Sequence, residues 1–100
     1  MSKYRFTPQA RDDLFDIWGF IAKDDRKAAE RVENAIYGAC DLIAEVPLAG
    51  QAREDLTRLP LRFWIVQPYT NYIIVYDPEK APLQIIRILH GARNLPGVLE

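Results

Sequence analysis

Apolar residues in the first quarter of the chain recur with the period of an α-helix. One face is formed by four residues spaced i, i+3, i+4 and i+7: Leu14, Ile17, Trp18 and Ile21. Thr7 and Pro8 precede this pattern, and threonine is a favourable N-cap while proline is tolerated at the first helical position. The pattern therefore predicts a helix that begins after Thr7 and runs to about Lys23.

A second helical pattern follows directly. Asp24 and Asp25 end the first helix and supply an N-cap for the second, which Pro47 ends. Its buried face is traced by eight residues: Ala28, Ala29, Val32, Ala35, Ile36, Ala39, Leu42 and Ile43. The short link predicts an antiparallel helix hairpin. Gly38 lies in the helix interior, where glycine costs about 1 kcal/mol relative to alanine, so it either marks a tight contact or has no role.

Runs with the character of β-strands occur at the N-terminus and throughout the second half. Residues 3–6 alternate polar and aromatic side chains and predict a short first strand. Three apolar, β-branched runs come later, separated by short turns that contain proline: residues 62–67, 72–77 and 83–90, with turns at 68–71 and 78–82. Short turns between such runs predict a three-stranded antiparallel meander.

The resulting element order is β-α-α-β-β-β. It predicts an α+β fold in which the helix hairpin packs on one face of a small, mainly antiparallel sheet. Residues 47–60 show no period and are bracketed by prolines, so they are expected to form an ordered surface loop. Apolar residues occur on both faces of the last two strands, so a tail or a partner is expected to cover the second face.

Length and composition narrow the class of protein. With 100 residues, of which 49% are hydrophobic and 27% charged, the chain is expected to form one globular domain over residues 1–100. No apolar run approaches the roughly 20 residues of a membrane span. The N-terminus lacks the apolar segment of a signal peptide, so a cytoplasmic location is expected.

Charge and the rarer residue types exclude some functions. Thirteen basic and fourteen acidic residues give no overall basic excess of the kind that phosphate-binding domains carry. A local basic patch is one possibility and scattered surface charge the other, for five arginines: Arg53, Arg58, Arg62, Arg87 and Arg93. Cys40 is the single cysteine and is expected to be a small buried hydrophobe. With one cysteine and one histidine, neither a disulfide, a metal site nor a cofactor is expected.

Three stretches together with the alanine-rich second helix cover almost the whole chain: residues 6–21 (FTPQARDDLFDIWGFI), 71–76 (NYIIVY) and 85–94 (IIRILHGARN). In this order they resemble the RelE/ParE superfamily of bacterial toxins, and its ParE branch in particular. The resemblance implies a toxin of a type II toxin–antitoxin system, neutralised by an antitoxin whose disordered segment wraps it. ParE-branch toxins are understood to inhibit DNA gyrase by trapping its cleaved-DNA state, whereas RelE-branch relatives cut mRNA on the ribosome.

The residues themselves bear on the choice of branch. RNA cleavage needs a base, an acid and cations that stabilise the developing phosphorane charge. The candidates are His90 as acid or base, with Arg62 and Arg93 as phosphate-binding cations. Strand alternation is expected to put His90 on the face of Ile86 and Ile88, opposite Arg87. Catalytic relatives tend to carry an arginine where this chain has Ile73, which favours the non-catalytic ParE-like function.

The same residues have other interpretations. His90 either closes the last strand through a backbone hydrogen bond or contacts a target, and Arg87 is expected to pair with Asp13 or Asp16. Candidates for binding a target or the antitoxin under the favoured interpretation are Arg62, Trp64, Tyr72, Tyr76, His90 and Arg93. Phe63 and the other aromatic residues are alternatively core filler. A non-toxic remnant that only binds its antitoxin is a third hypothesis.

Overall fold

The two helices begin at the capping residues that the sequence predicts. In the computed structural model, which describes residues 3–91, α1 spans Pro8–Ala22 and α2 spans Arg26–Glu45. The Thr7 hydroxyl oxygen accepts a hydrogen bond from the Ala10 N–H, and the Asp25 carboxylate accepts one from the Ala28 N–H, both at 3.0 Å. Each cap satisfies an N–H that has no partner within its helix. Within the described range, neither helix is long and apolar enough to cross a membrane.

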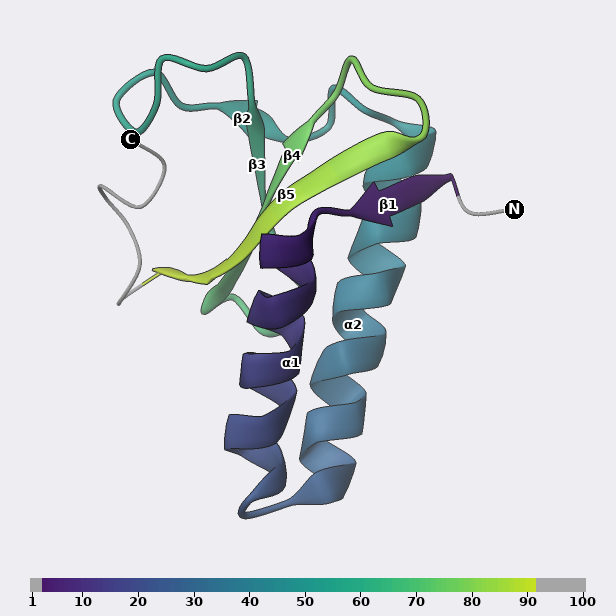
Figure 1. The fold of residues 1–100 in the computed structure, drawn as a ribbon, viewed down its shortest axis with the longest axis vertical. Helices are drawn as coiled ribbons and strands as arrows, with labels where there is room; N and C mark the ends of the chain where they lie inside the picture. The colour runs from purple at the N-terminus through teal and green to yellow at the C-terminus, as the bar shows by residue number, and fades with distance from the viewer. Residues whose placement is uncertain (1–2, 92–100) are drawn as a thin grey trace.

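A five-stranded mixed sheet packs against the helix hairpin (Figure 1). Its strands are β1 (Tyr4–Phe6), β2 (Gln51–Ala52), β3 (Arg62–Ile65), β4 (Tyr72–Asp77) and β5 (Leu83–His90). They lie in the order β1-β5-β4-β3-β2, with β1 parallel to β5 and the other pairs antiparallel. The predicted α+β fold and the meander are confirmed. The two-residue β2 lies inside the stretch that the sequence predicts to be a loop.

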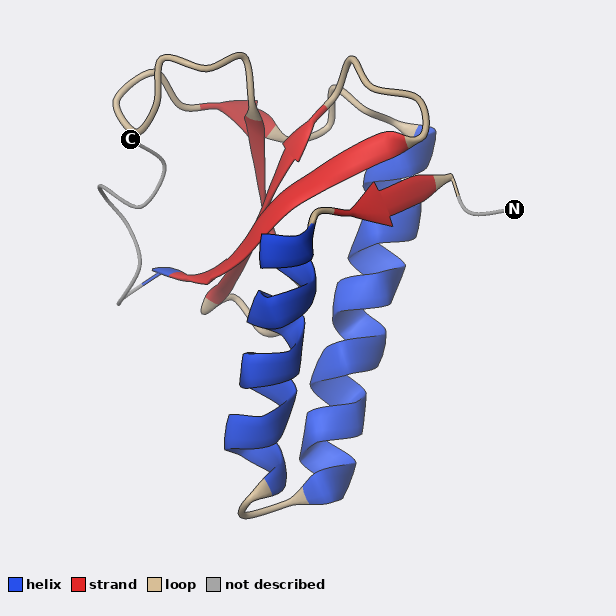
Figure 2. Cartoon of the chain, in the orientation of Figure 1, coloured by secondary structure: helices blue, strands red, loops and turns tan. Residues whose placement is uncertain are grey.

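Apolar residues form clusters on both faces of the sheet. The face toward the helices (blue in Figure 2) is packed by residues of α1, α2 and four strands, among them Leu14, Ile36, Ile43, Ile74 and Ile85. The opposite face, here called the far face, is packed by Leu61, Phe63, Val75 and Leu89, with Leu56, Ile73 and Ile86 at their border. The segment between β2 and β3 therefore supplies cover for the far face, a role that the sequence suggests for a tail or a partner.

A β-bulge in β5 changes which residues share a face. Tyr76 of β4 pairs with Ile85 whereas the preceding Val75 pairs with Arg87, so Ile86 is an extra residue. As a result Ile85 and Ile88 both pack toward the helices, while Ile86 packs on the far face. The expectation that His90 shares a face with both Ile86 and Ile88 is therefore wrong for Ile86, because strict alternation does not continue through a bulge.

The start of α1 completes the edge of β5 that β1 leaves open. The Thr7 N–H donates to the Ile85 carbonyl at 3.0 Å, and the Thr7 hydroxyl donates to the Ile86 carbonyl at 2.7 Å. Further along, the Ile88 N–H donates to the Asp13 carboxylate at 3.0 Å. Side chains of the cap and of α1 thus satisfy backbone groups that a longer β1 would otherwise pair. This arrangement fixes α1 against the second half of β5.

The buried Cys40 thiol gives a first testable prediction. The side chain is fully buried in the helix-facing core, and burial raises its thiol pKa from about 9.0 to about 12. Since the thiolate is the nucleophile, the folded protein is expected to resist alkylation by iodoacetamide at pH 8, and urea should restore rapid reaction. Mass spectrometry of the intact protein measures the adduct. Rapid alkylation without urea would show that the α2 face opens readily.

Candidate functional site

His90, at the end of β5, pairs with Tyr72 across the β4–β5 ladder. The two rings contact edge to face with their centroids 5.6 Å apart. Both side chains line a hollow between α1 and the sheet, together with Asp13, Asp16, Ile17, Phe20 and Ile88. The hollow combines aromatic and aliphatic surface with two carboxylates, and no arginine or lysine lines it. Such surroundings suit a basic or apolar protein side chain better than a phosphate.

Arg87, which lies two residues after the paired Ile85, is bound to a carboxylate of α1. Its Nε donates to Asp13 Oδ2 at 2.7 Å and its Nη2 donates to Asp13 Oδ1 at 2.9 Å, so the pair is bidentate. Asp13 holds the pKa of the Arg87 guanidinium above its usual value. The predicted pairing with a helix carboxylate is confirmed, with Asp13 as the partner. Arg87 therefore serves the contact between α1 and β5.

Arg62 lies far from His90 along the sheet. Its Nη1 donates to the Gly50 carbonyl at 2.7 Å and to the Leu48 carbonyl at 3.4 Å. Arg62 pairs with Tyr76 and His90 pairs with Tyr72, four residues away on β4, which corresponds to roughly 13 Å along the strand. The structure thus does not bring these two ribonuclease candidates to one phosphate. Arg93, the third candidate, lies outside the described residues.

Tyr76 is a structural residue. It is fully buried; its hydroxyl donates to the Pro47 carbonyl at 2.7 Å and accepts from the Gly50 N–H at 2.8 Å. Together with Arg62 it anchors the turn between α2 and β2 to the sheet. Tyr76 consequently offers no surface to a partner in this structure, and Arg62 offers its guanidinium mainly to backbone carbonyls.

The arginines of the second half do not form one patch. Arg53 makes a bidentate ion pair with Asp55, and Arg87 lies on the α1 side of the molecule. A hollow beside the β2–β3 segment is lined by three of the five arginines and two glutamates: Arg53, Arg58, Arg62, Glu54 and Glu79. The described residues thus show mixed charge there, and they contain no group of three or more potential metal ligands.

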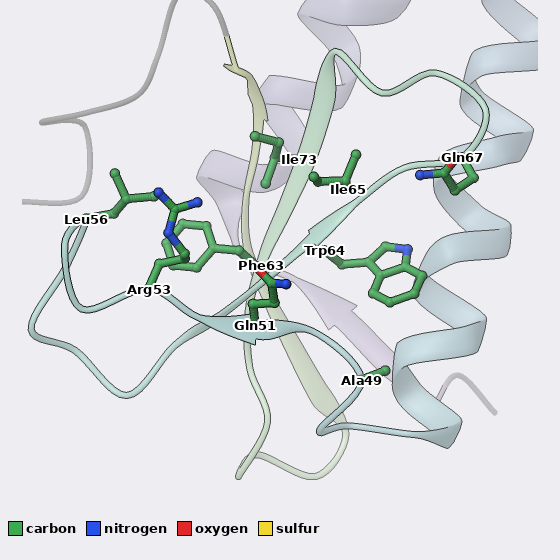
Figure 3. A pocket seen from close by; sticks show the side chains of 9 residues that line it. All are labelled: Ala49, Gln51, Arg53, Leu56, Phe63, Trp64, Ile65, Gln67 and Ile73. Carbon is green, nitrogen blue, oxygen red and sulfur yellow. The ribbon is translucent and has the colours of Figure 1, made fainter.

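Trp64 leads to a different part of the surface, the outer edge of β3. Its half-buried side chain packs against the helix-facing core and lines a second hollow with Phe63, Ile65, Gln67 and Arg53. Figure 3 shows Leu56 and Phe63 on one side of β3 and Trp64 on the other, toward α2. Ile65 is 50% exposed in the middle of this edge. The sequence pattern does not distinguish Ile65 from buried strand residues, because only the sheet order shows that β3 is nearly at the edge.

Two aromatic residues of α1 were also missed by the motif analysis. Phe15 is 76% exposed and Phe20 is 63% exposed, and Phe20 lines the His90 hollow. Both lie outside the apolar stripe that predicts the helix, and large apolar residues outside such a stripe are a signal that could have found them. The described surface therefore has apolar groups on α1 and on the β3 edge.

The fold and these surfaces define a small α+β domain whose prominent features are apolar binding surfaces rather than a cluster of catalytic groups. The chain belongs to the ParE toxin family: the family described as ParE toxin of type II toxin-antitoxin system, parDE, matches residues 4–95. The "Putative toxin Y4kP" of Sinorhizobium fredii is 34% identical over 98 residues, covering 97% of this chain and 96% of that protein. A solved structure of the chromosomal ParDE TA system from P. aeruginosa has a similar fold, with a TM-score of 0.69, 18% identity and coverage of 87% of this chain and 92% of that chain.

Proposed function

We propose that this ParE-family toxin acts by binding DNA gyrase and carries out no chemistry of its own. The observation that supports this best is the make-up of the His90 hollow. Its charged lining consists of Asp13 and Asp16, and the nearest guanidinium in sequence, Arg87, is already paired with Asp13. Carboxylates repel the developing charge of a phosphorane, whereas they attract basic side chains of a protein target.

A cognate antitoxin is the second proposed partner. Family membership supports it, as does the apolar surface on α1 and on the β3 edge, because exposed aromatic and aliphatic groups favour association with another protein. Trp64 and Tyr72 border these surfaces and are the sequence candidates best placed to contact a partner. Toxin and antitoxin would form a hetero-oligomer in the cytoplasm, where gyrase works, with residues 1–100 acting as one domain.

Pulse-labelling of cells after induction of the toxin tests the target. Thymidine incorporation is expected to fall severalfold before methionine incorporation changes, because a trapped gyrase blocks replication directly. Purified toxin should inhibit supercoiling by gyrase and increase the amount of cleaved DNA. Co-expression of the antitoxin should abolish both effects, which controls for general toxicity of overproduction.

The opposite order of events would support an mRNA endonuclease. One observation favours keeping this alternative: His90 lies beside Tyr72 in an open hollow, where an acid or base could reach a substrate. In that case methionine incorporation would fall first, and His90→Gln would abolish RNA cleavage without unfolding the protein. Under the gyrase proposal no RNA cleavage is expected from either protein. Normal synthesis of both DNA and protein would indicate a non-toxic remnant that only binds its antitoxin.

A further inference from the structure

The outer edge of β3 is paired over only part of its length. β2 pairs with Phe63 and Arg62, through Gln51 and Ala52 respectively. The next backbone groups that face outward belong to Ile65. Inward and outward groups alternate along a strand, and the Val66 N–H donates inward to the Tyr72 carbonyl of β4 at 3.0 Å. The N–H and C=O of Ile65 therefore point toward the open edge.

The cause of this opening lies in the residues just before β2. A continued β2 would place Ala49 opposite Ile65, but the Gly50 N–H donates to Tyr76 Oη and the Ala49 N–H donates to the Val46 carbonyl. The chain is thus held in a turn and leaves the edge before it reaches Ile65. A second extended segment, placed end to end with β2, would continue the same ladder along β3.

The hollow along this edge suits the side chains of such a segment. Its volume is about 250 Å³, below the roughly 300–1,000 Å³ of pockets that hold small molecules and cofactors. Leu56, Phe63 and Ile73 line the far-face side, and Trp64 lies on the side of α2 (Figure 3). Side chains of a strand alternate between faces, so successive residues of an added strand would contact these two sides in turn.

Charge narrows the chemistry of the added strand. Arg53 is the single charged residue among the described residues that line this hollow. Its guanidinium already binds a carboxylate, that of the exposed Asp55, at 2.9 and 2.7 Å. The site is therefore built to accept a carboxylate at its rim and apolar side chains within it.

We propose that the antitoxin adds an extended segment to β3 at Ile65, with aliphatic side chains in the hollow and an acidic side chain near Arg53. The inference rests on the proposed antitoxin partnership. Strand addition of this kind obtains affinity from main-chain hydrogen bonds and specificity from pockets for alternate side chains. The exposed Ile65 backbone and side chain are the centre of the binding site.

Amide hydrogen exchange of the co-purified toxin–antitoxin complex tests this proposal residue by residue. The Ile65 amide should exchange quickly in the free toxin and at least tenfold more slowly in the complex. The Trp64 and Val66 amides, which face β4, should be protected in both states. An unchanged Ile65 rate in a stable complex would overturn the added strand while leaving the antitoxin partnership intact. Failure of any complex to form would overturn both.

Substitutions on the edge give a second test by affinity. Ile65→Pro removes the outward N–H, a change that edge strands accommodate, and should weaken antitoxin binding about tenfold. Ile65→Val retains the N–H and should change the affinity less than threefold. Leu59→Ser, which alters an exposed apolar residue outside this hollow, should have no effect. Equal affinity of the proline and valine variants would contradict the main-chain pairing.

Charge reversal tests the role of the acidic side chain. Arg53→Glu should weaken binding about tenfold, whereas Arg58→Glu makes the same change of net charge outside the hollow and should have a much smaller effect. Equal losses for the two variants would mean that only overall charge matters and would overturn the placement of an acidic residue at Arg53.

Discussion

Replacing Gly50 with alanine is expected to lower the free energy of unfolding by about 3 kcal/mol. A β-carbon at Gly50 would lie 2.6 Å from Tyr76 Oη, 2.8 Å from Tyr76 Cε1 and 2.9 Å from the Phe63 carbonyl oxygen, all closer than real contacts allow. Neither neighbour can move easily, because Tyr76 is fully buried and Phe63 O belongs to a paired strand. For a domain of this size the melting temperature should fall by roughly 10–20 °C.

Gly38→Ala is the matched control for this prediction. No atom lies within 4 Å of a β-carbon placed at Gly38, so this glycine marks no tight contact, contrary to one of its two sequence interpretations. In the interior of α2 the substitution should stabilise the protein by about 1 kcal/mol. Urea unfolding of both variants separates the effects. Wild-type stability of Gly50→Ala would show that the turn between α2 and β2 can shift away from Tyr76.

Local patterns in the sequence predicted most of the fold. Thr7 and Asp25 act as N-caps as expected, because a cap depends only on the residue and the helix that follows it. The runs at 72–77 and 83–90 form β4 and β5 over the predicted ranges, because each combines β-branched residues with adjacent turn signals. The run predicted at 62–67 ends earlier, at Ile65, since only part of it pairs within the sheet.

Features that depend on tertiary pairing were not predictable in the same way. The bulge at Ile86 arises from the register between β4 and β5, which no local pattern encodes. Tyr76 reads as an exposed or packing aromatic in the sequence, yet its role comes from two backbone partners 26 and 29 residues away. The open edge at Ile65 likewise follows from the two-residue length of β2. Site predictions therefore failed where function depends on which strand ends beside which.

The Asp13–Arg87 pair is the one long-range side-chain contact that the sequence did suggest, and it leads to the second large prediction. Asp13→Ala should lower the free energy of unfolding by about 3 kcal/mol. The side chains are only 16% and 21% exposed, so the change leaves a largely desolvated guanidinium without its partner. It also removes the acceptor of the Ile88 N–H at the edge of β5. Thermal and urea unfolding measure the loss.

Asp12→Ala is the matched control, since this neighbouring carboxylate is exposed on the same helix and should change stability by less than about 0.5 kcal/mol. A double-mutant cycle then isolates the pair. Asp13→Ala combined with Arg87→Met should cost less than the sum of the single changes, because the second substitution removes the unpaired charge that the first leaves behind. Additive losses would show that the carboxylate acts mainly through Ile88. If Arg87→Met folded normally but lost toxicity, the structural role would be wrong, and the guanidinium would instead belong to the surface that binds the target.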